Sequence, residues 1–129
     1  MLFTKGSVRV ISSYIKYLFT AKDEYHIHSP FVYDFYTKAL KGRDNDTLVR
    51  LGVTTMVEIP VEQLLERYLS EREEHVFYYV RDIHQSKAKE EAWNAICGHP
   101  QVVLTLDFYR FGYVFYRNGM EKQNFVLRR

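Results

Sequence analysis

Apolar residues recur every three or four positions in the first third of the chain, a spacing typical of amphipathic helices. This spacing predicts a helix over residues 7–22. A second helix should follow, because the Ser29 hydroxyl can cap it, Pro30 suits the first helical position and Gly42 suits its end. We therefore predict an N-terminal helical segment over residues 1–42 that contains two helices.

Strand-like and helix-like patterns alternate after that segment. Residues 53–59 are rich in β-branched side chains, and residues 75–80 are nearly all apolar or aromatic, as in a strand buried on both faces. Between them, an apolar stripe with charged residues on the opposite side predicts a helix that begins near Pro60. A further helix is predicted from its cap at Ser86 to its stop at Gly98.

The last part of the chain predicts strands only. Residues 102–108 alternate between apolar and polar positions, residues 113–117 supply a partner strand, and residues 125–127 can add a short terminal strand. Helices that alternate with strands in this way favour an α/β fold, in which helices pack on a sheet. We expect an antiparallel hairpin at the C-terminal end of that sheet.

The length and composition fit one domain. The chain has 129 residues, of which 47% are hydrophobic and 26% are charged. We divide this single domain, residues 1–129, into the helical segment, a connecting segment over residues 43–60 that opens with turn formers, and an α/β unit over residues 61–129. Cys97 is the single cysteine, which suits a reducing cytoplasm. Because no apolar run approaches the roughly 20 residues of a membrane span, we expect a cytoplasmic protein without a membrane partner.

The net charge and the aromatic content indicate which partners the protein has. The formal net charge of +2 is small for a dedicated nucleic-acid binder, so we do not expect nucleic acid as a partner. Aromatic residues make up 16% of the chain, and 11 of them are tyrosines. Because tyrosine packs its ring but keeps a polar tip, this content indicates wet clefts or a subunit interface in addition to a core.

Three sequence blocks resemble a known enzyme family. Residues 21–35 read AKDEYHIHSPFVYDF, residues 80–86 read VRDIHQS and residues 111–117 read FGYVFYR. The first block resembles the N-terminal signature, and the other two resemble C-terminal motifs, of a class I S-adenosylmethionine-dependent methyltransferase family of Bacteroidetes-type bacteria. The similar regions cover about residues 12–42 and 61–129.

The part of that family's fold that holds the cofactor has no counterpart in this sequence. The resemblance implies a doubly wound sheet in which a glycine-rich turn after the first strand, and then an acidic residue, bind S-adenosylmethionine. The six glycines occupy positions 6, 42, 52, 98, 112 and 119, which fits no G-x-G-x-x-G fingerprint. Gly52 is the nearest candidate, but it precedes a predicted strand. We therefore expect no cofactor, and a partial Rossmann-like methyltransferase sheet, a half-sheet over residues 61–129, with two N-terminal helices.

The missing strands leave one edge of the half-sheet in question. The resemblance implies that the last three strands lie side by side, with the final strand antiparallel between the other two. The strand from Val76 to Val80 would then lose a neighbour and expose an apolar edge. Residues 53–59 could replace the lost strand, or two copies could pair edge to edge. We favour a homodimer through the edge from Val76 to Val80.

Asp82 and His84 form the first candidate site. They follow a buried strand, where open α/β sheets usually bind ligands. In the resembled family the position of Arg81 is an acid, and a carboxylate pair there could hold a divalent metal or polarise a substrate hydroxyl. Because Arg81 replaces that pair with a cation, we expect an ion pair with Asp82 and no metal. A turn residue at the strand end is the simpler interpretation of Asp82.

His26 and His28 form the second candidate site. They flank Ile27, so in an extended backbone both rings point the same way and could ligate zinc. No third histidine or cysteine follows at a characteristic spacing, and a hydrogen-bonded helix entry is the simpler interpretation. We therefore predict no metal site and retain Asp82, His84, His26 and His28 as catalytic candidates.

Three functions fit these patterns. The first is a truncated methyltransferase-like protein that is non-catalytic and acts as a dimeric or partner-binding module. The second is a methyltransferase subunit whose cofactor-binding half is supplied by another chain. The third is a module that binds a small ligand or nucleic acid through its tyrosine-rich surface.

Overall fold

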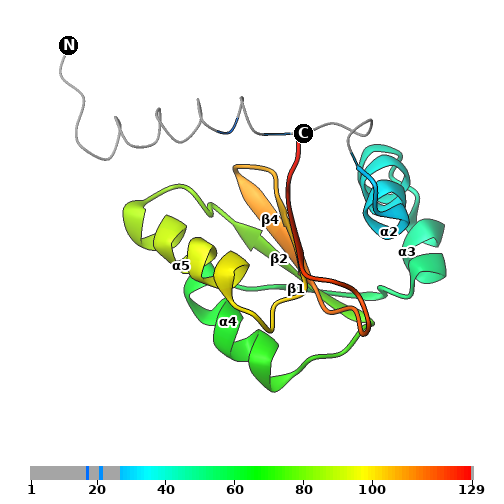
Figure 1. Cartoon of the computed structure of the whole chain (residues 1–129). Helices are drawn as coiled ribbons and strands as arrows, with labels where there is room; N and C mark the ends of the chain where they lie inside the picture. The colour runs from blue at the N-terminus through cyan, green and yellow to red at the C-terminus, as the bar shows by residue number, and fades with distance from the viewer. Residues whose placement is uncertain (1–16, 18–20, 22–26, 129) are drawn as a thin grey trace, which may run out of the picture.

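A five-stranded mixed sheet lies between two layers of helices (Figure 1). The computed structural model describes residues 17, 21 and 27–128. The strands are β1 (Thr55–Glu58), β2 (Val76–Arg81), β3 (Leu104–Asp107), β4 (Phe111–Phe115) and β5 (Gln123–Val126). They lie in the order β1-β2-β4-β3-β5, and β4 is antiparallel to both of its neighbours. The predicted α/β class and the antiparallel hairpin near the C-terminal end are thus confirmed.

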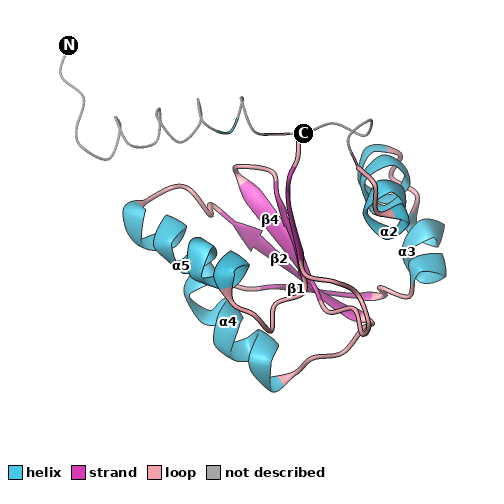
Figure 2. Ribbon diagram, viewed as in Figure 1, coloured by secondary structure: helices cyan, strands magenta, loops and turns pink. Residues whose placement is uncertain are grey.

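Helices cover both faces of the sheet. α4 (Val61–Ser70) and α5 (Lys87–Gly98) lie on one face (Figure 2). α2 (Pro30–Asp34), its continuation η2 (Phe35–Lys41) and α3 (Asn45–Leu51) lie on the other. Each layer buries its own cluster of apolar side chains against the sheet, so the sheet is covered on both sides.

β2 and β4 lie inside the sheet and contribute side chains to both apolar clusters. Phe77 of β2 stacks on Phe115 of β4 in the cluster beneath α2, with ring centroids 5.3 Å apart. Tyr78 and Val114 alternate with them and belong to the cluster beneath α4 and α5. This is the burial on both faces predicted for residues 75–80.

The helix predicted after Ser29 is confirmed, together with its two ends. The N–H of Val32 donates to Ser29 Oγ over 3.3 Å, and Pro30 occupies the first helical position. The second half of the helix is π-helical, and it ends at Gly42. A Cβ atom at Gly42 would lie 2.7 Å from the carbonyl oxygen of Lys38, so the stop requires a residue without a side chain.

α3 is a helix that the sequence pattern did not predict. Residues 43–60, expected as a connecting segment, contain both α3 and β1. Asp44 caps α3 by accepting a hydrogen bond from the N–H of Asp46 over 3.0 Å, and Gly52 ends it in the left-handed conformation. The turn formers concealed the helix because caps and turns use the same residue types. Gly52 terminates a helix and forms no cofactor turn.

The strand expected to form a free edge has a neighbour. β1 pairs with β2 in parallel, from Thr55 opposite Val76 to Glu58 opposite Tyr79. The prediction of an exposed edge from Val76 to Val80 is therefore wrong, because the β-branched segment before α4 supplies the replacing strand. A homodimer stays a prediction, and it needs another surface.

The helix predicted over residues 7–22 lies outside the described residues, apart from Tyr17 and Ala21. The Tyr17 hydroxyl donates a hydrogen bond to the carbonyl oxygen of Leu127, and Arg128 Nε donates to the carbonyl oxygen of Ala21 over 3.2 Å. These two positions therefore contact the chain just after β5. Within the described part of the chain, no helix is long and apolar enough to cross a membrane.

Candidate functional site

The carboxyl ends of four strands meet at one edge of the sheet. β1, β2, β3 and β5 run in the same direction, and β4 alone runs against them. Asp82 follows β2, Asp107 is the last residue of β3, and Tyr109 and Arg110 lie in the loop that leads into β4. Ligands usually bind at such an edge in open α/β sheets. The edge also carries His84, so both residues of the first candidate pair are found there.

His84 lies between two carboxylates. Its Nδ1 atom is 2.5 Å from Oε2 of Glu90 on α5, and its Nε2 atom is 2.7 Å from Oδ2 of Asp107. Ionised carboxylates only accept hydrogen bonds, and a neutral imidazole has a single N–H, so this geometry fits the doubly protonated ring. Burial by itself lowers the pKa of His84, but the hydrogen bonds and charges of Asp107 and Glu90 outweigh it and raise the pKa above 6.5.

Asp107 holds this cluster together. Besides His84, its Oδ2 atom accepts a hydrogen bond from Trp93 Nε1 over 3.2 Å, and its Oδ1 atom accepts one from the N–H of Tyr109 over 2.7 Å. The Tyr109 ring stacks on the His84 ring with centroids 5.2 Å apart. The Asp107 side chain is only 11% exposed, so these hydrogen bonds are partly shielded from water. The network fixes the loop after β3 against α5.

The sequence did not identify Glu90, Trp93 and Asp107 as site residues. Asp107 carried one signal, because it is an acid at the end of a strand whose positions are all buried. Its partner His84 is 23 residues away in the chain. Only the pairing of β3 and β2 with β4 brings the two residues to the same edge.

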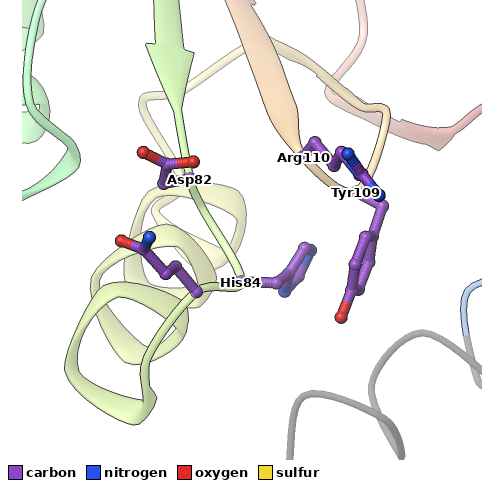
Figure 3. Close-up of a pocket in the computed structure, with 5 residues that line it drawn as sticks. Asp82, His84, Tyr109 and Arg110 are labelled. Carbon is purple, nitrogen blue, oxygen red and sulfur yellow. The ribbon is translucent and has the colours of Figure 1, made fainter.

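A pocket of about 280 Å³ opens beside the cluster. Its lining residues are Asp82, His84, Gln85, Tyr109 and Arg110, and we call it the Asp82–Arg110 cleft. Figure 3 shows Asp82 on one side, Tyr109 and Arg110 on the other, and His84 between them. Asp82, Gln85 and Arg110 are exposed. The cleft therefore presents a carboxylate, an amide and a guanidinium to solvent.

The backbone on both sides of the cleft is held in an unfavourable conformation. Asp82 has φ 59° and Tyr109 has φ 72°, which lie in the left-handed region that few residues other than glycine adopt. The N–H of Asp82 donates to the carbonyl oxygen of Arg110 over 2.7 Å, and the N–H of Gln85 donates to the carbonyl oxygen of Asp82 over 3.1 Å. The two turns thus hold each other, and the shape of the cleft is set before a ligand binds.

A second cavity, of about 310 Å³, adjoins the first and shares Asp82 with it. In this cavity Arg81 Nε lies 2.5 Å from Oε1 of Glu58, the last residue of β1. The predicted ion pair between Arg81 and Asp82 is therefore wrong. Arg81 is still part of β2 and meets the end of the parallel neighbour β1, whereas the chain leaves the sheet through the turn at Asp82. The simpler interpretation of Asp82 as a turn residue is confirmed.

Of the remaining candidates, His28 does not line either cavity. His28 is exposed and precedes α2, and His26 is not among the described residues, so their pairing is untested. Within residues 27–128, together with positions 17 and 21, no group of three His, Cys, Asp or Glu side chains could hold a metal ion. Burial raises the pKa of Cys97 to about 11, which keeps the thiol protonated at neutral pH.

Comparison with known proteins gives this chain no relative. No protein-family model, no curated protein and no solved structure matches it.

Proposed function

We propose that this chain is a methyltransferase-like binding module, which holds a small polar molecule in the Asp82–Arg110 cleft and does not transfer a methyl group by itself. The position of the cleft carries this proposal. It lies at the carboxyl edge of the parallel strands, between two turns that a hydrogen bond from Asp82 to Arg110 holds together. Its volume of about 280 Å³ is close to the lower end of the range for small-molecule sites.

The strand arrangement supports a methyltransferase lineage. β4 lies between β2 and β3 and is antiparallel to both, which is the arrangement that the sequence resemblance implies for the family's last three strands. β5, which follows β4 and pairs with β3 in parallel, is an addition to that arrangement. The strand that precedes them, β1, is followed by Ile59 and Pro60 and then by α4. The glycine-rich turn that the resemblance implies after the family's first strand has no counterpart in this sequence, and the turn after β1 contains no glycine. We therefore expect binding without methyl transfer.

The state of His84 also favours binding over catalysis. A general base needs a free lone pair within reach of the substrate. Both ring nitrogens of His84 instead face carboxylates, which raise the pKa of His84 and favour the protonated ring. We infer that His84 fixes the floor of the cleft, and that the exposed side chains of Asp82, Gln85 and Arg110 meet the ligand.

A direct test is a binding screen by NMR on the full chain. The probes are small polyols, alkylamines, carboxylates and amino acids, and the readout is the amide shifts of residues 82–85 and 109–110. We expect at least one class to shift these amides selectively. Shifts spread over the whole surface, or none at all, would contradict the proposal.

A filled cleft provides the matched control. Gln85→Trp places a large ring in the cleft and should abolish the shifts, because Gln85 is exposed and lines it. Glu66→Trp puts the same ring on the exposed side of α4, away from the cleft, and should leave binding unchanged. Equal effects of both substitutions would contradict a site at the cleft.

A calorimetric titration with S-adenosylmethionine tests the second half of the proposal. We expect no heat from a folded sample, because no part of the cleft is glycine-rich. Micromolar binding by this chain alone would overturn the non-catalytic assignment. Binding that needs a second, purified chain would support the hypothesis of a subunit whose cofactor half is supplied by another chain.

A further inference from the structure

The Asp82–Arg110 cleft contains an acidic and a basic side chain, and both can contact a ligand. Arg81 is paired with Glu58, and Lys89 lies 3.9 Å from Glu62. Within the described part of the chain, neither Asp82 nor Arg110 takes part in an ion pair. Figure 3 shows the two side chains on opposite sides of the cleft.

The aromatic ring that lines the cleft already packs against other side chains of the protein. The Tyr109 ring stacks on His84, and its centroid is 5.4 Å from that of Tyr17. Little of this ring is left for a ligand to stack on, since Tyr109 is 8% exposed. Recognition must therefore depend on the carboxylate, the guanidinium and the amide of Gln85.

From this arrangement we propose that the ligand is a small zwitterion of the amino-acid class, with its ammonium group at Asp82 and its carboxylate at Arg110. The proposal rests on the binding function proposed above and names its chemistry. A simple anion would meet Asp82, and a simple cation would meet Arg110, so each would leave one like charge unsatisfied. A zwitterion pairs both groups and keeps the charge of the cleft balanced.

The size of the cleft fits this class. A volume of about 280 Å³ equals roughly nine water molecules at about 30 Å³ each. That space suits an amino acid. The planar guanidinium of Arg110 can hold both oxygens of a carboxylate, which a hydroxyl group of a sugar could not exploit.

The test compares three probes of the same length on the full chain. 4-Aminobutyrate carries both charges, butylamine carries only the ammonium group and butyrate carries only the carboxylate. Glycine and 6-aminohexanoate vary the distance between the two charges. We expect one of the zwitterions to bind about tenfold or more tightly than either singly charged analogue, because each charge contributes one charge-assisted hydrogen bond.

Two substitutions assign each charge to its partner. In Asp82→Asn the ammonium group of the ligand should no longer add to its affinity, so the zwitterion and butyrate should bind equally. In Arg110→Gln the carboxylate of the ligand should no longer add to its affinity, so the zwitterion and butylamine should bind equally. Arg81→Gln, which removes a neighbouring cation already paired with Glu58, should preserve the preference for the zwitterion. Unchanged amide shifts away from the cleft would show that the variants fold.

The outcomes separate this inference from the function on which it rests. If polyols or a singly charged probe bind the cleft as tightly as every zwitterion, the proposal of a zwitterionic ligand is wrong, but the proposed binding function stands. If no probe of any class binds, both the zwitterionic ligand and the binding function are wrong. If the zwitterion preference survives in both Asp82→Asn and Arg110→Gln, the assignment of the two charges is wrong.

Discussion

His84 and Asp107 are 23 residues apart in the sequence, and their side chains meet over 2.7 Å at the carboxyl edge of the sheet. Glu90 contacts the other ring nitrogen, so the ring is held from both sides. This contact joins the turn after β2 to the end of β3, and it therefore sets the floor of the Asp82–Arg110 cleft. The first two predictions concern this relationship.

His84→Gln should lower the free energy of unfolding by about 2 kcal/mol at pH 6, because two hydrogen bonds to charged groups are lost. The pKa of His84 is raised on folding, so protonation favours the folded state. Its stabilising contribution is complete below pH 6.5 and is lost as the pH rises through the raised pKa. Urea unfolding followed by the fluorescence of Trp93, the chain's single tryptophan, measures the effect. His75→Gln, at an exposed histidine outside this cluster, is the matched control for the loss of a histidine.

Asp107→Asn should lower the pKa of His84. Burial opposes the charge on the ring, and Asp107 supplies the largest of the favourable contributions. An NMR titration of the His84 ring protons against pH gives the value directly. Asp46→Asn, on the exposed surface of α3, provides the comparison and should leave the titration unchanged. An equal pKa in the native and Asp107→Asn chains would contradict the assigned network.

Gly112→Ala should destabilise the fold by about 1–3 kcal/mol. A Cβ atom at Gly112 would lie 2.6 Å from the ring of Trp93, and the ring cannot retreat without losing its hydrogen bond to Asp107. Trp93→Phe in the same chain should recover part of the loss, which a double-mutant cycle would reveal as coupling. A Cβ atom at Gly98 would have no neighbouring atom within 4 Å, so Gly98→Ala should leave the stability unchanged or raise it slightly. If both glycine substitutions have the same effect, steric contact with Trp93 is not the cause.

Asp82→Gly should leave the fold as stable as before, or up to about 1 kcal/mol more stable. Asp82 has φ 59°, and glycine adopts this conformation without strain. The same substitution removes the carboxylate of the cleft, so the preference for a zwitterion over butyrate should disappear. Thermal unfolding and the NMR binding series measure the two effects on one sample. A large loss of stability would show that the side chain of Asp82 holds the turn, which contradicts its assignment to a ligand.

β1 is one of the two edge strands of the sheet, and its outward backbone groups could pair with those of a second copy. Thr55 donates its N–H to the carbonyl oxygen of His75, just before β2, and Ile59 donates to that of Tyr79 in β2, so the alternating residues Met56 and Glu58 direct theirs away from the sheet. Met56→Pro removes only an outward donor and should convert a dimer to a monomer in sedimentation experiments. Val57→Pro removes an inward donor and should destabilise the fold itself. A dimer that persists in Met56→Pro would exclude this edge as the interface.

The sequence determined the elements on which this structure is built. The cap at Ser29, the stop at Gly42, the apolar run of β2 and the cap at Ser86 all act where the local pattern placed them. These features depend on residues close together in the chain, where hydrogen bonding and side-chain periodicity decide the conformation. The same local reasoning missed α3, because its cap at Asp44 is also a good turn residue.

Only the tertiary structure decided how these elements form a site. The sequence named Asp82 and His84, but it paired Arg81 with Asp82, since neighbours in the chain are the natural candidates for an ion pair. Arg81 of β2 instead pairs with Glu58 of the neighbouring strand β1, and His84 after β2 pairs with Asp107 at the end of β3. Strand order is fixed by the burial of two apolar clusters over the whole chain, so no local pattern contains it. For that reason, only the tertiary structure shows which charged side chains line the cleft.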